Sequence, residues 1–434
     1  MSALEQAIPV GFKQTEVGII PQEWQVLTID EAIASKMILD QMDGNHGELY
    51  PKSHEFKDDG IPYVGATDFY SGKIDYKHCK RLPLKRAKLF KKGVAKDGDV
   101  LFAHNATVGP SSIVETHEDF IIISTTATYY RCNSEQIKNT YLLNFFRSKL
   151  FENQYSSVMS QSTRNQVPIL AQRKFYLALP HIKEQTAIAN ALSDVDALLA
   201  ELEKLIAKKQ AIITATMQQL LTGKTRLPQF ATYSEGEKQG QQKDTKSSEL
   251  GEIPENWVVA TIGDFAPLQR GFDLTNSDRR EGIYPVVYSN GIVNHHSEYQ
   301  VKGPGVVTGR SGTLGKVHYI DSDYWPHNTS LWVTKFEIAH PKYVYYLFKF
   351  IGFERFASGS GVPTLNRNDA HDFKIAAPST KKEQNAIATI LSDMDNEIQT
   401  LEQRLAKTRQ IKQGMMQELL TGRTRLPFKQ AMEA

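Results

Sequence analysis

Residues 183–228 and 382–427 form a repeat that constrains the fold more than any other feature of the sequence. The two segments align without a gap, with 183 corresponding to 382, and more than half of the aligned positions are identical. A shorter match precedes each copy, between TEVGIIPQEW at 15–24 and SELGEIPENW at 248–257. The chain therefore contains one unit twice, and each unit has an opening motif, a variable region and a closing segment.

The closing segments predict two long helices. Apolar residues recur at alternating spacings of four and three, which is the pattern of a coiled-coil seam. No Pro or Gly interrupts 182–222, so the first helix would span about 60 Å. Gly223 and Gly422 mark the predicted ends, and basic residues and a proline follow each glycine. The predicted seam consists of Ile188, Leu192, Val195, Leu199, Leu202 and Ile206 in the first helix and Ile387, Leu391, Met394, Ile398, Leu401 and Leu405 in the second.

Such a stripe has two interpretations. It can pack on the core of its own domain, which is the commoner case, or the two seams can pack on each other. The narrowness of both stripes and the presence of two equivalent seams in one chain favour mutual packing. We expect an antiparallel pair, which would place the variable regions at opposite ends.

Residues 229–248 separate the first helix from the second unit. They contain no Leu, Ile, Val or Met and are rich in Gln, Lys, Ser and Gly. Such a segment cannot bury a core, so we expect a flexible linker.

The variable regions, 25–180 and 258–378, predict mixed α/β domains. Short β-branched and aromatic runs bounded by turns indicate strands, and a helix is expected near Thr140–Phe151 and near Pro341–Phe353. The expected strands include Ile61–Val64, Val100–Phe102, Phe120–Ser124, Tyr284–Tyr288, Val306–Thr308 and Leu331–Val333.

A glycine-rich loop at 305–317, GVVTGRSGTLGKV, has a counterpart at 100–110. It is not a phosphate-binding P-loop, because the spacing is one residue too long and Val317 stands where Ser or Thr would hold magnesium. A tight turn is the plain interpretation. The functional one is a loop that presents Arg310, Ser311 and Thr313 to phosphates or base edges.

Two further features are candidates for DNA contact. Polar loops at 160–166 and 358–368 carry Arg, Asn and Gln, which form paired hydrogen bonds with bases, and 76–96 contains Lys and Arg but no acid. Solvated turns and a solvated charged face are the alternatives. The candidate DNA-binding residues are Lys80, Arg81, Lys85, Arg86, Asn105, Thr107, Gln161, Ser162, Thr163, Arg164, Asn165, Ser289, Asn290, Arg310, Ser311, Thr313, Lys316, Ser360, Thr364, Asn366 and Arg367.

The sequence predicts no catalytic or metal site. It lacks an Asn/Asp-Pro-Pro-Tyr/Phe methyl-transfer motif, a Phe-x-Gly-x-Gly cofactor loop and a Walker A sequence. Cys79 and Cys132 are not in a Cys-x-x-Cys pair, so we expect neither a disulfide framework nor zinc. No signal core or long apolar run is present, and we expect a cytoplasmic protein. The net charge of +2 neither demands nor excludes a nucleic-acid partner.

With this order of segments, the chain resembles the specificity subunits of type I restriction–modification systems over nearly its whole length. The resemblance rests on GIIPQEW and GEIPENW at the domain openings, EQTAIA and EQNAIA in the helices and LLTG at both helix ends. It implies two target recognition domains that each read half of a split DNA site, with the helices as a ruler. It also implies two modification subunits that carry S-adenosylmethionine and methylate adenine, and restriction subunits driven by ATP with magnesium.

The expected fold is α+β, with two mixed α/β recognition domains separated by an antiparallel coiled coil and related by a pseudo-two-fold repeat. A single-chain DNA methyltransferase or restriction enzyme and a DNA-independent coiled-coil scaffold are the alternatives. The expected segments are a first recognition domain (1–180), a helical spacer (181–226), a flexible linker (227–250), a second recognition domain (251–379), a second spacer (380–426) and a tail (427–434).

Overall fold

The computed structural model describes residues 8–427, except 46, 71, 162–164 and 359–363. The chain forms two compact units: unit 1 contains residues 1–201 and 405–434, and unit 2 contains residues 202–404. The two long helices, α6 (Ile182–Leu221) and α11 (Lys381–Leu419), each contribute one part to each unit. No helix among the described residues is long and apolar enough to cross a membrane.

Unit 1 contains two four-stranded sheets, ordered β4-β11-β8-β9 and β6-β5-β10-β7. Two strand pairs, β1-β2 and β3-β12, complete it. The strands are β1 (Phe12–Thr15), β2 (Gly18–Pro21), β3 (Gln25–Thr28), β4 (Ile38–Asp43), β5 (Ile61–Val64), β6 (Lys80–Leu82), β7 (Val94–Ala95), β8 (Val100–Asn105), β9 (Thr107–Ile113), β10 (Ile121–Ile123), β11 (Ala127–Cys132) and β12 (Tyr176–Leu179). The short helices are α1 (Ile29–Ala34), α2 (Leu84–Ala87), α3 (Asn139–Phe146), α4 (Lys149–Ser160) and α5 (Ile169–Gln172).

Unit 2 repeats much of this topology. Its larger sheet has the order β16-β22-β19-β20, a second sheet has the order β18-β17-β21, and β15-β25, β13-β14 and β23-β24 form pairs. The strands are β13 (Thr245–Ser248), β14 (Gly251–Pro254), β15 (Trp257–Thr261), β16 (Leu268–Arg270), β17 (Tyr284–Tyr288), β18 (Gly291–His296), β19 (Gly305–Gly309), β20 (Val317–Ile320), β21 (Trp325–Pro326), β22 (Ser330–Val333), β23 (Ala357–Ser358), β24 (Thr364–Leu365) and β25 (Lys374–Pro378). The short helices are α7 (Pro228–Ala231), α8 (Ile262–Phe265), α9 (Pro341–Ile351) and α10 (Arg367–Asp372).

The predicted elements agree with this description at most positions. The expected strands at 61–64 and 284–288 have the observed bounds, and the helix expected near Pro341–Phe353 is α9. The helix expected over Thr140–Phe151 is interrupted after Phe146, because the Ser148 side chain caps the start of α4 by accepting a hydrogen bond from the Phe151 amide.

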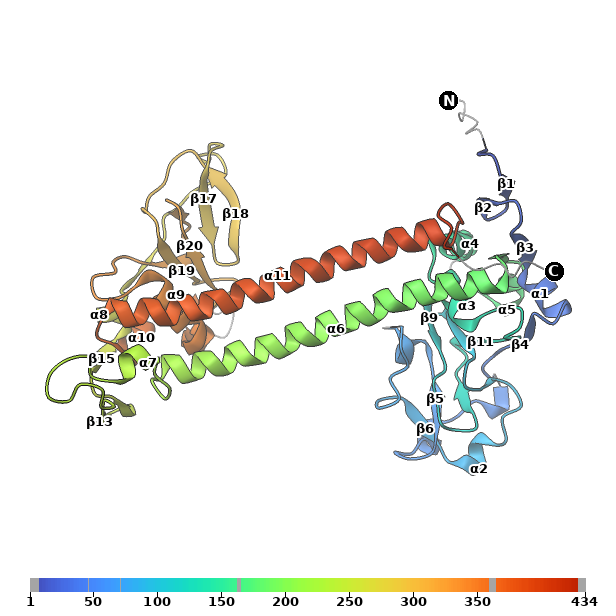
Figure 1. Cartoon of the computed structure of the whole chain (residues 1–434), viewed down its shortest axis with the longest axis horizontal. Coiled ribbons are helices and arrows are strands. Elements are labelled where there is room, and N and C mark those ends of the chain that lie inside the picture. Colours follow the sequence, from blue (N-terminus) through green and yellow to red (C-terminus); the bar gives the residue numbers. More distant parts are fainter. Residues whose placement is uncertain (1–7, 46, 71, 162–164, 359–363, 428–434) are drawn as a thin grey trace. The chain divides into compact units, whose positions relative to one another are not determined.

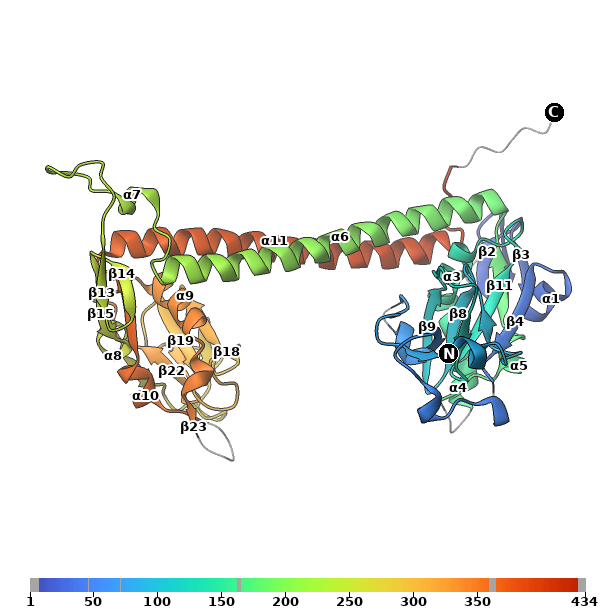
Figure 2. The same cartoon turned by 90° about the horizontal axis from the view of Figure 1, so that it is seen from below.

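Seven of the twelve predicted seam residues lie in or against the cores of the two units. All twelve predicted seam positions are buried or half-buried, and segments of α6 and α11 lie side by side (Figure 1, Figure 2). In unit 1, Ile188 and Leu192 share a core with Leu419 and Leu420. The two segments run antiparallel, because the first part of α6 packs against the last part of α11.

Unit 2 shows the same antiparallel packing with the roles of the helices exchanged. The end of α6, including Ile213 and Leu220, shares a core with Ile387 and Leu391 at the start of α11. Trp257 and the aromatic face of α9 join this core. Each large side chain buried there contributes about 1.5–3 kcal/mol, so the helices and the recognition region of unit 2 are stabilised together.

The repeated opening and closing motifs pack against each other. Gly422, at the end of α11, has φ +67°, and a Cβ there would approach Pro21 to 2.3 Å. Gly223, at the end of α6, has φ +70°, and its Cβ would approach Pro254 to 2.7 Å. Glycine is required at both positions because the left-handed backbone and the close proline each exclude a side chain.

In each unit an ion pair joins the start of one long helix to the segment that follows the end of the other. In unit 1, Arg425 Nη2 donates to Glu184 Oε2 at 2.9 Å. In unit 2, the repeat-equivalent Arg226 Nη2 donates to Glu383 Oε2 at 2.8 Å. The carboxylates of both pairs are almost completely buried, with 2% of the side chain exposed.

The expectation of a flexible linker at 227–250 is wrong for this structure. Pro228–Ala231 is helix α7, and Thr245–Ser248 pairs with β14 as strand β13. Between them, Tyr233 bonds to Glu255 through its hydroxyl, and the ammonium groups of Lys238 and Lys243 lie over its ring. The segment lacks aliphatic residues, but backbone pairing and one aromatic ring organise it without a core.

Candidate nucleic-acid interface

The tips of two equivalent hairpins, β8-β9 in unit 1 and β19-β20 in unit 2, collect polar side chains from distant parts of the chain. Each hairpin crosses a later segment at one isolated antiparallel bridge, which joins Asn105 to Gln166 in unit 1 and Ser311 to Thr364 in unit 2. These bridges bring Gln166 and Thr364, from the predicted polar loops, to the predicted glycine loop of each domain.

One backbone pattern holds both tips. In unit 1, the His104 amide donates to Thr126 O at 3.0 Å, and the His104 carbonyl accepts from the Val167 amide at 2.8 Å. In unit 2, the Arg310 amide donates to Thr329 O at 2.9 Å, and the Arg310 carbonyl accepts from the Leu365 amide at 2.8 Å. His104 and Arg310 therefore occupy equivalent positions.

The threonine in each pattern, Thr126 or Thr329, also bonds to the residues that follow strand β5 or β17. Its hydroxyl accepts from the Ala66 amide at 2.9 Å in unit 1 and from the Ser289 amide at 3.3 Å in unit 2. The turn that carries the threonine is held in the same way, because the Ser124 amide donates to Val64 O and the His327 amide donates to Val287 O. We call these residues the hairpin frame: Val64, Ala66, His104, Ser124, Thr126 and Val167 in unit 1, and Val287, Ser289, Arg310, His327, Thr329 and Leu365 in unit 2.

The glycine loop of unit 2 is a tight turn that folds back on its own strand. A Cβ on Gly309 would lie 1.9 Å from Thr313 O, so only glycine fits there. The Gly309 amide donates to Lys316 O, and Lys316 Nζ reaches Asn290 O at 3.2 Å. The loop thereby places exposed Thr313 and Lys316 beside the turn that follows β17.

The structure brings together most of the candidate residues of unit 2. Ser289, Asn290, Arg310, Ser311, Thr313, Lys316 and Thr364 belong to the frame, its bridge or the adjoining loop. Asn366 and Arg367 follow directly after β24, but the Asn366 side chain accepts from the Asn368 amide and caps α10. Ser360 lies outside the described residues.

In unit 1 some candidates lie at or near the tip of the β8-β9 hairpin and the others lie on β6 and α2. Asn105, Thr107 and Asn165 lie at the hairpin tip, where the Asn165 side chain donates to Ala106 O at 3.1 Å. Gln161 is an exposed residue at the end of α4. Ser162, Thr163 and Arg164 lie outside the described residues.

The basic run of unit 1 lies on β6 and α2, away from the strands of the hairpin. Lys80 and Lys85 are exposed, as expected for phosphate contact. The two arginines have structural partners: Arg81 donates to Gly60 O and Tyr76 O, and Arg86 pairs with Glu55 at 2.5 Å. Lys80 and Lys85 therefore remain the candidates of these two elements for phosphate contact, with the Lys80 ammonium 5.0 Å from the centre of the Phe56 ring.

Sequence reasoning missed the turn that carries the frame threonine. Thr125 and Asn328 are its central residues, both half-buried, and the Asn328 amide group contacts the Asp273 carboxylate. The two turns, STTA at 124–127 and HNTS at 327–330, share only the threonine. A single shared residue could not reveal the equivalence, but each turn directly follows a buried strand, which is a usable signal.

Burial governs the histidines of this region. Burial lowers the pKa of His327, whose ring stacks on Tyr288 with centroids 4.2 Å apart and contacts Thr329 Oγ1 at 3.1 Å. Burial also lowers the pKa of His318, which lies 3.4 Å from Ser289 O. Burial therefore favours the neutral form of both rings, which makes them poorly suited to attract phosphate.

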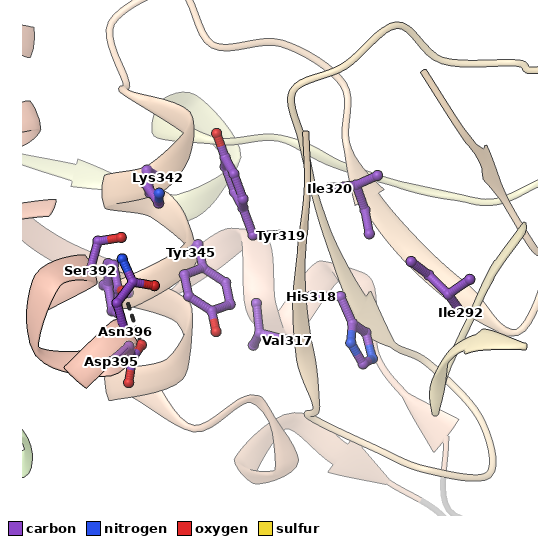
Figure 3. A pocket seen from close by; sticks show the side chains of 11 residues that line it. Ile292, Val317, His318, Tyr319, Ile320, Lys342, Tyr345, Ser392, Asp395 and Asn396 are labelled. Atoms are coloured by element: carbon purple, nitrogen blue, oxygen red, sulfur yellow. Dashed lines mark hydrogen bonds between the residues drawn. The ribbon is translucent and has the colours of Figure 1, made fainter. Parts of the chain in front are cut away.

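A cavity of about 400 Å³ lies beside the unit 2 hairpin, between β20, α9 and α11. Tyr319 and Tyr345 form adjacent parts of its wall, with ring centroids 6.0 Å apart (Figure 3). Asp395 of α11 accepts from the Tyr346 hydroxyl at 2.9 Å and lies 3.4 Å from Lys349. These contacts tie the recognition region to the helix, and among the described residues no cluster of His, Cys, Asp and Glu could hold a metal ion.

Comparison with known proteins gives a consistent result. A family model described as the type I restriction modification DNA specificity domain matches residues 21–212 and 254–410. A putative type I restriction enzyme MjaX specificity subunit of Methanocaldococcus jannaschii is 24% identical, covering 96% of this chain and 97% of the relative. The MjaVIII specificity subunit of the same organism is 26% identical over half of each chain.

Two solved structures share the fold. The type I restriction–modification S subunit from M. genitalium has a TM-score of 0.57 and 14% identity, covering 91% of this chain and 96% of the other. A chain from a study of complex assembly and conformational transition in a type I system has a TM-score of 0.54 and 15% identity, covering 93% and 99%. At these identities the likeness shows the fold alone.

Proposed function

The chain belongs to the family of type I restriction–modification DNA specificity domains and, with two such domains, is a specificity subunit; we propose that each domain reads one half of a bipartite DNA site. The observation that carries this proposal is the hairpin frame. The same backbone hydrogen bonds recur in both units while the side chains around them differ. Two readers with one scaffold and unlike contact surfaces suit an asymmetric target.

The side chains at the tips have the chemistry for reading bases. Asn and Gln form paired hydrogen bonds with adenine, Arg does so with guanine, and Ser and Thr bond to bases or phosphates. The exposed lysines of both units suit phosphate contacts, which orient a protein on the duplex without reading sequence.

We further propose that this chain performs no chemistry itself. The support is the lack of methyl-transfer and nucleotide-binding motifs in its sequence. Two modification subunits that carry S-adenosylmethionine would methylate adenine, and restriction subunits that use ATP and magnesium would cleave. The assembly would act in the cytoplasm.

Reconstitution tests the division of labour. The chain, its modification subunits and S-adenosylmethionine are incubated with a DNA library, and methylated sites are sequenced. We expect adenine methylation in one bipartite sequence only when both components are present. Methylation by the chain alone would establish a single-chain enzyme, and methylation without sequence preference would favour a scaffold.

A further inference from the structure

We propose that three paired positions around the hairpin frame determine which bases each domain reads: Asn105 and Ser311, Thr125 and Asn328, and Gln166 and Thr364. This inference rests on the proposed function and names the residues that carry it. Residues 125 and 328 have no role in any sequence-based expectation, so the frame alone identifies them.

The equivalence of each pair follows from the backbone bonds. Asn105 and Ser311 each follow the residue that donates to the frame threonine, at His104 and Arg310. Gln166 and Thr364 are their bridge partners, and each precedes the residue whose amide bonds back to the hairpin.

The third pair is set by the turn. Thr125 and Asn328 each lie between a residue whose amide bonds to the neighbouring strand, Ser124 or His327, and the frame threonine. The parallel pairing of β10 with β5 corresponds to that of β21 with β17, so the turns leave equivalent sheets at equivalent strands.

Burial supports a reading role. All six side chains are half-buried, so they are neither core residues nor freely moving surface residues. The next residue along the chain is apolar and buried in each unit, as Val167 in unit 1 and Leu365 in unit 2. We exclude the equivalent residues His104 and Arg310 from the set because their exposure differs: His104 is 2% exposed and Arg310 is half-exposed.

The chemistry of the six residues points the same way. Each is a short neutral side chain with hydrogen-bonding capacity, of the types that contact base edges in the major groove. Backbone groups and the threonine hydroxyl hold the frame, so the same backbone arrangement carries different side chains at these positions in the two units. A pair of hydrogen bonds to the right base discriminates by on the order of 10- to 100-fold, which is enough to set a half-site.

The test exchanges the side chains of one unit for those of the other. Ser311→Asn, Asn328→Thr and Thr364→Gln are introduced together into the full chain, which is assembled with its modification subunits, and the methylated motif is sequenced. We expect the half-site read by unit 2 to change at one or more bases, by 10-fold or more in preference, while the other half-site stays the same. Ser322→Asn, at an exposed position outside the frame, is the matched control and should leave the motif unchanged.

Since a triple exchange can reduce methylation below detection, the three single exchanges and the reverse exchange in unit 1 (Asn105→Ser, Thr125→Asn, Gln166→Thr) are measured alongside. An unchanged motif in every variant that methylates overturns the inference while leaving the proposed function intact. If the unaltered complex methylates no bipartite site, the proposed function itself fails.

Discussion

At the scale of residues, two buried ion pairs join the repeated segments at the ends of the long helices. Glu383 accepts three hydrogen bonds from Arg226 and a further one from the Trp257 indole at 3.3 Å. The equivalent Glu184 is bonded by Arg425, which also contacts Glu23 and thereby lowers the pKa of that carboxyl group. These contacts explain why the glutamate of EQ and the arginine of TRLP occur in both copies of the repeat.

Removing one partner of the buried pair should be costly. Arg226→Ala leaves the Glu383 carboxylate buried without its counter-charge, and we expect the free energy of unfolding of unit 2 to fall by about 3 kcal/mol. Urea denaturation followed by tryptophan fluorescence measures this. Lys335→Ala breaks the exposed pair with Glu337 and should cost less than about 1 kcal/mol; equal losses in the two variants would contradict the assignment.

At the scale of elements, the hairpin frame depends on one hydroxyl in each unit. Thr329→Val leaves the buried Ser289 amide without its acceptor, at a cost of about 1–3 kcal/mol. We expect methylation of the cognate site to fall about 10-fold or more, with no change in the sequence read. Thr400→Val, on the exposed face of α11, serves as the control. Undiminished methylation by Thr329→Val would show that the bond between the Thr329 hydroxyl and the Ser289 amide is not needed for recognition.

The histidines of unit 2 predict a pH dependence. Burial lowers the pKa of His318, His327, His340 and His371 below the ordinary value near 6.5. The unfolded chain then binds more protons than the folded chain, so stability is present above pH 6.5 and is lost as the pH falls through the lowered values. Hydrogen exchange, corrected for intrinsic rates, should show unit 2 losing more protection than unit 1 between pH 7.5 and 6.0. Equal losses in both units would contradict this.

The sequence predicts the helices and strands better than it predicts the tertiary contacts between them. The seam from Ile188 to Leu405 is readable because helical periodicity is written directly into the order of apolar residues. Most strands follow from apolar runs for the same reason. The equivalence of Thr126 and Thr329 cannot be read from the sequence, because backbone groups form most of the frame and the surrounding side chains differ between the two units. The segment around Tyr233 is likewise ordered by backbone pairing, which its polar composition does not reveal.

At the scale of the whole molecule, the proposed ruler makes a quantitative prediction. Four residues inserted after Leu202 in α6, with a matching insertion after Leu401 in α11, lengthen each helix by about 6 Å. We expect the accepted gap between the half-sites to change while both half-site sequences persist. Sequencing of methylated sites in cells that carry the variant measures the gap, and an unaltered gap would show that the helices do not set it.

The central claim is that one chain holds two independent readers, and exchange of a single domain tests it most directly. Residues 25–180 are replaced by the corresponding region of another specificity subunit, and the methylated motif is sequenced genome-wide with the same modification subunits. The account predicts that one half-site changes while the second half-site and the gap persist. A change in both halves, or an unchanged motif, would contradict it.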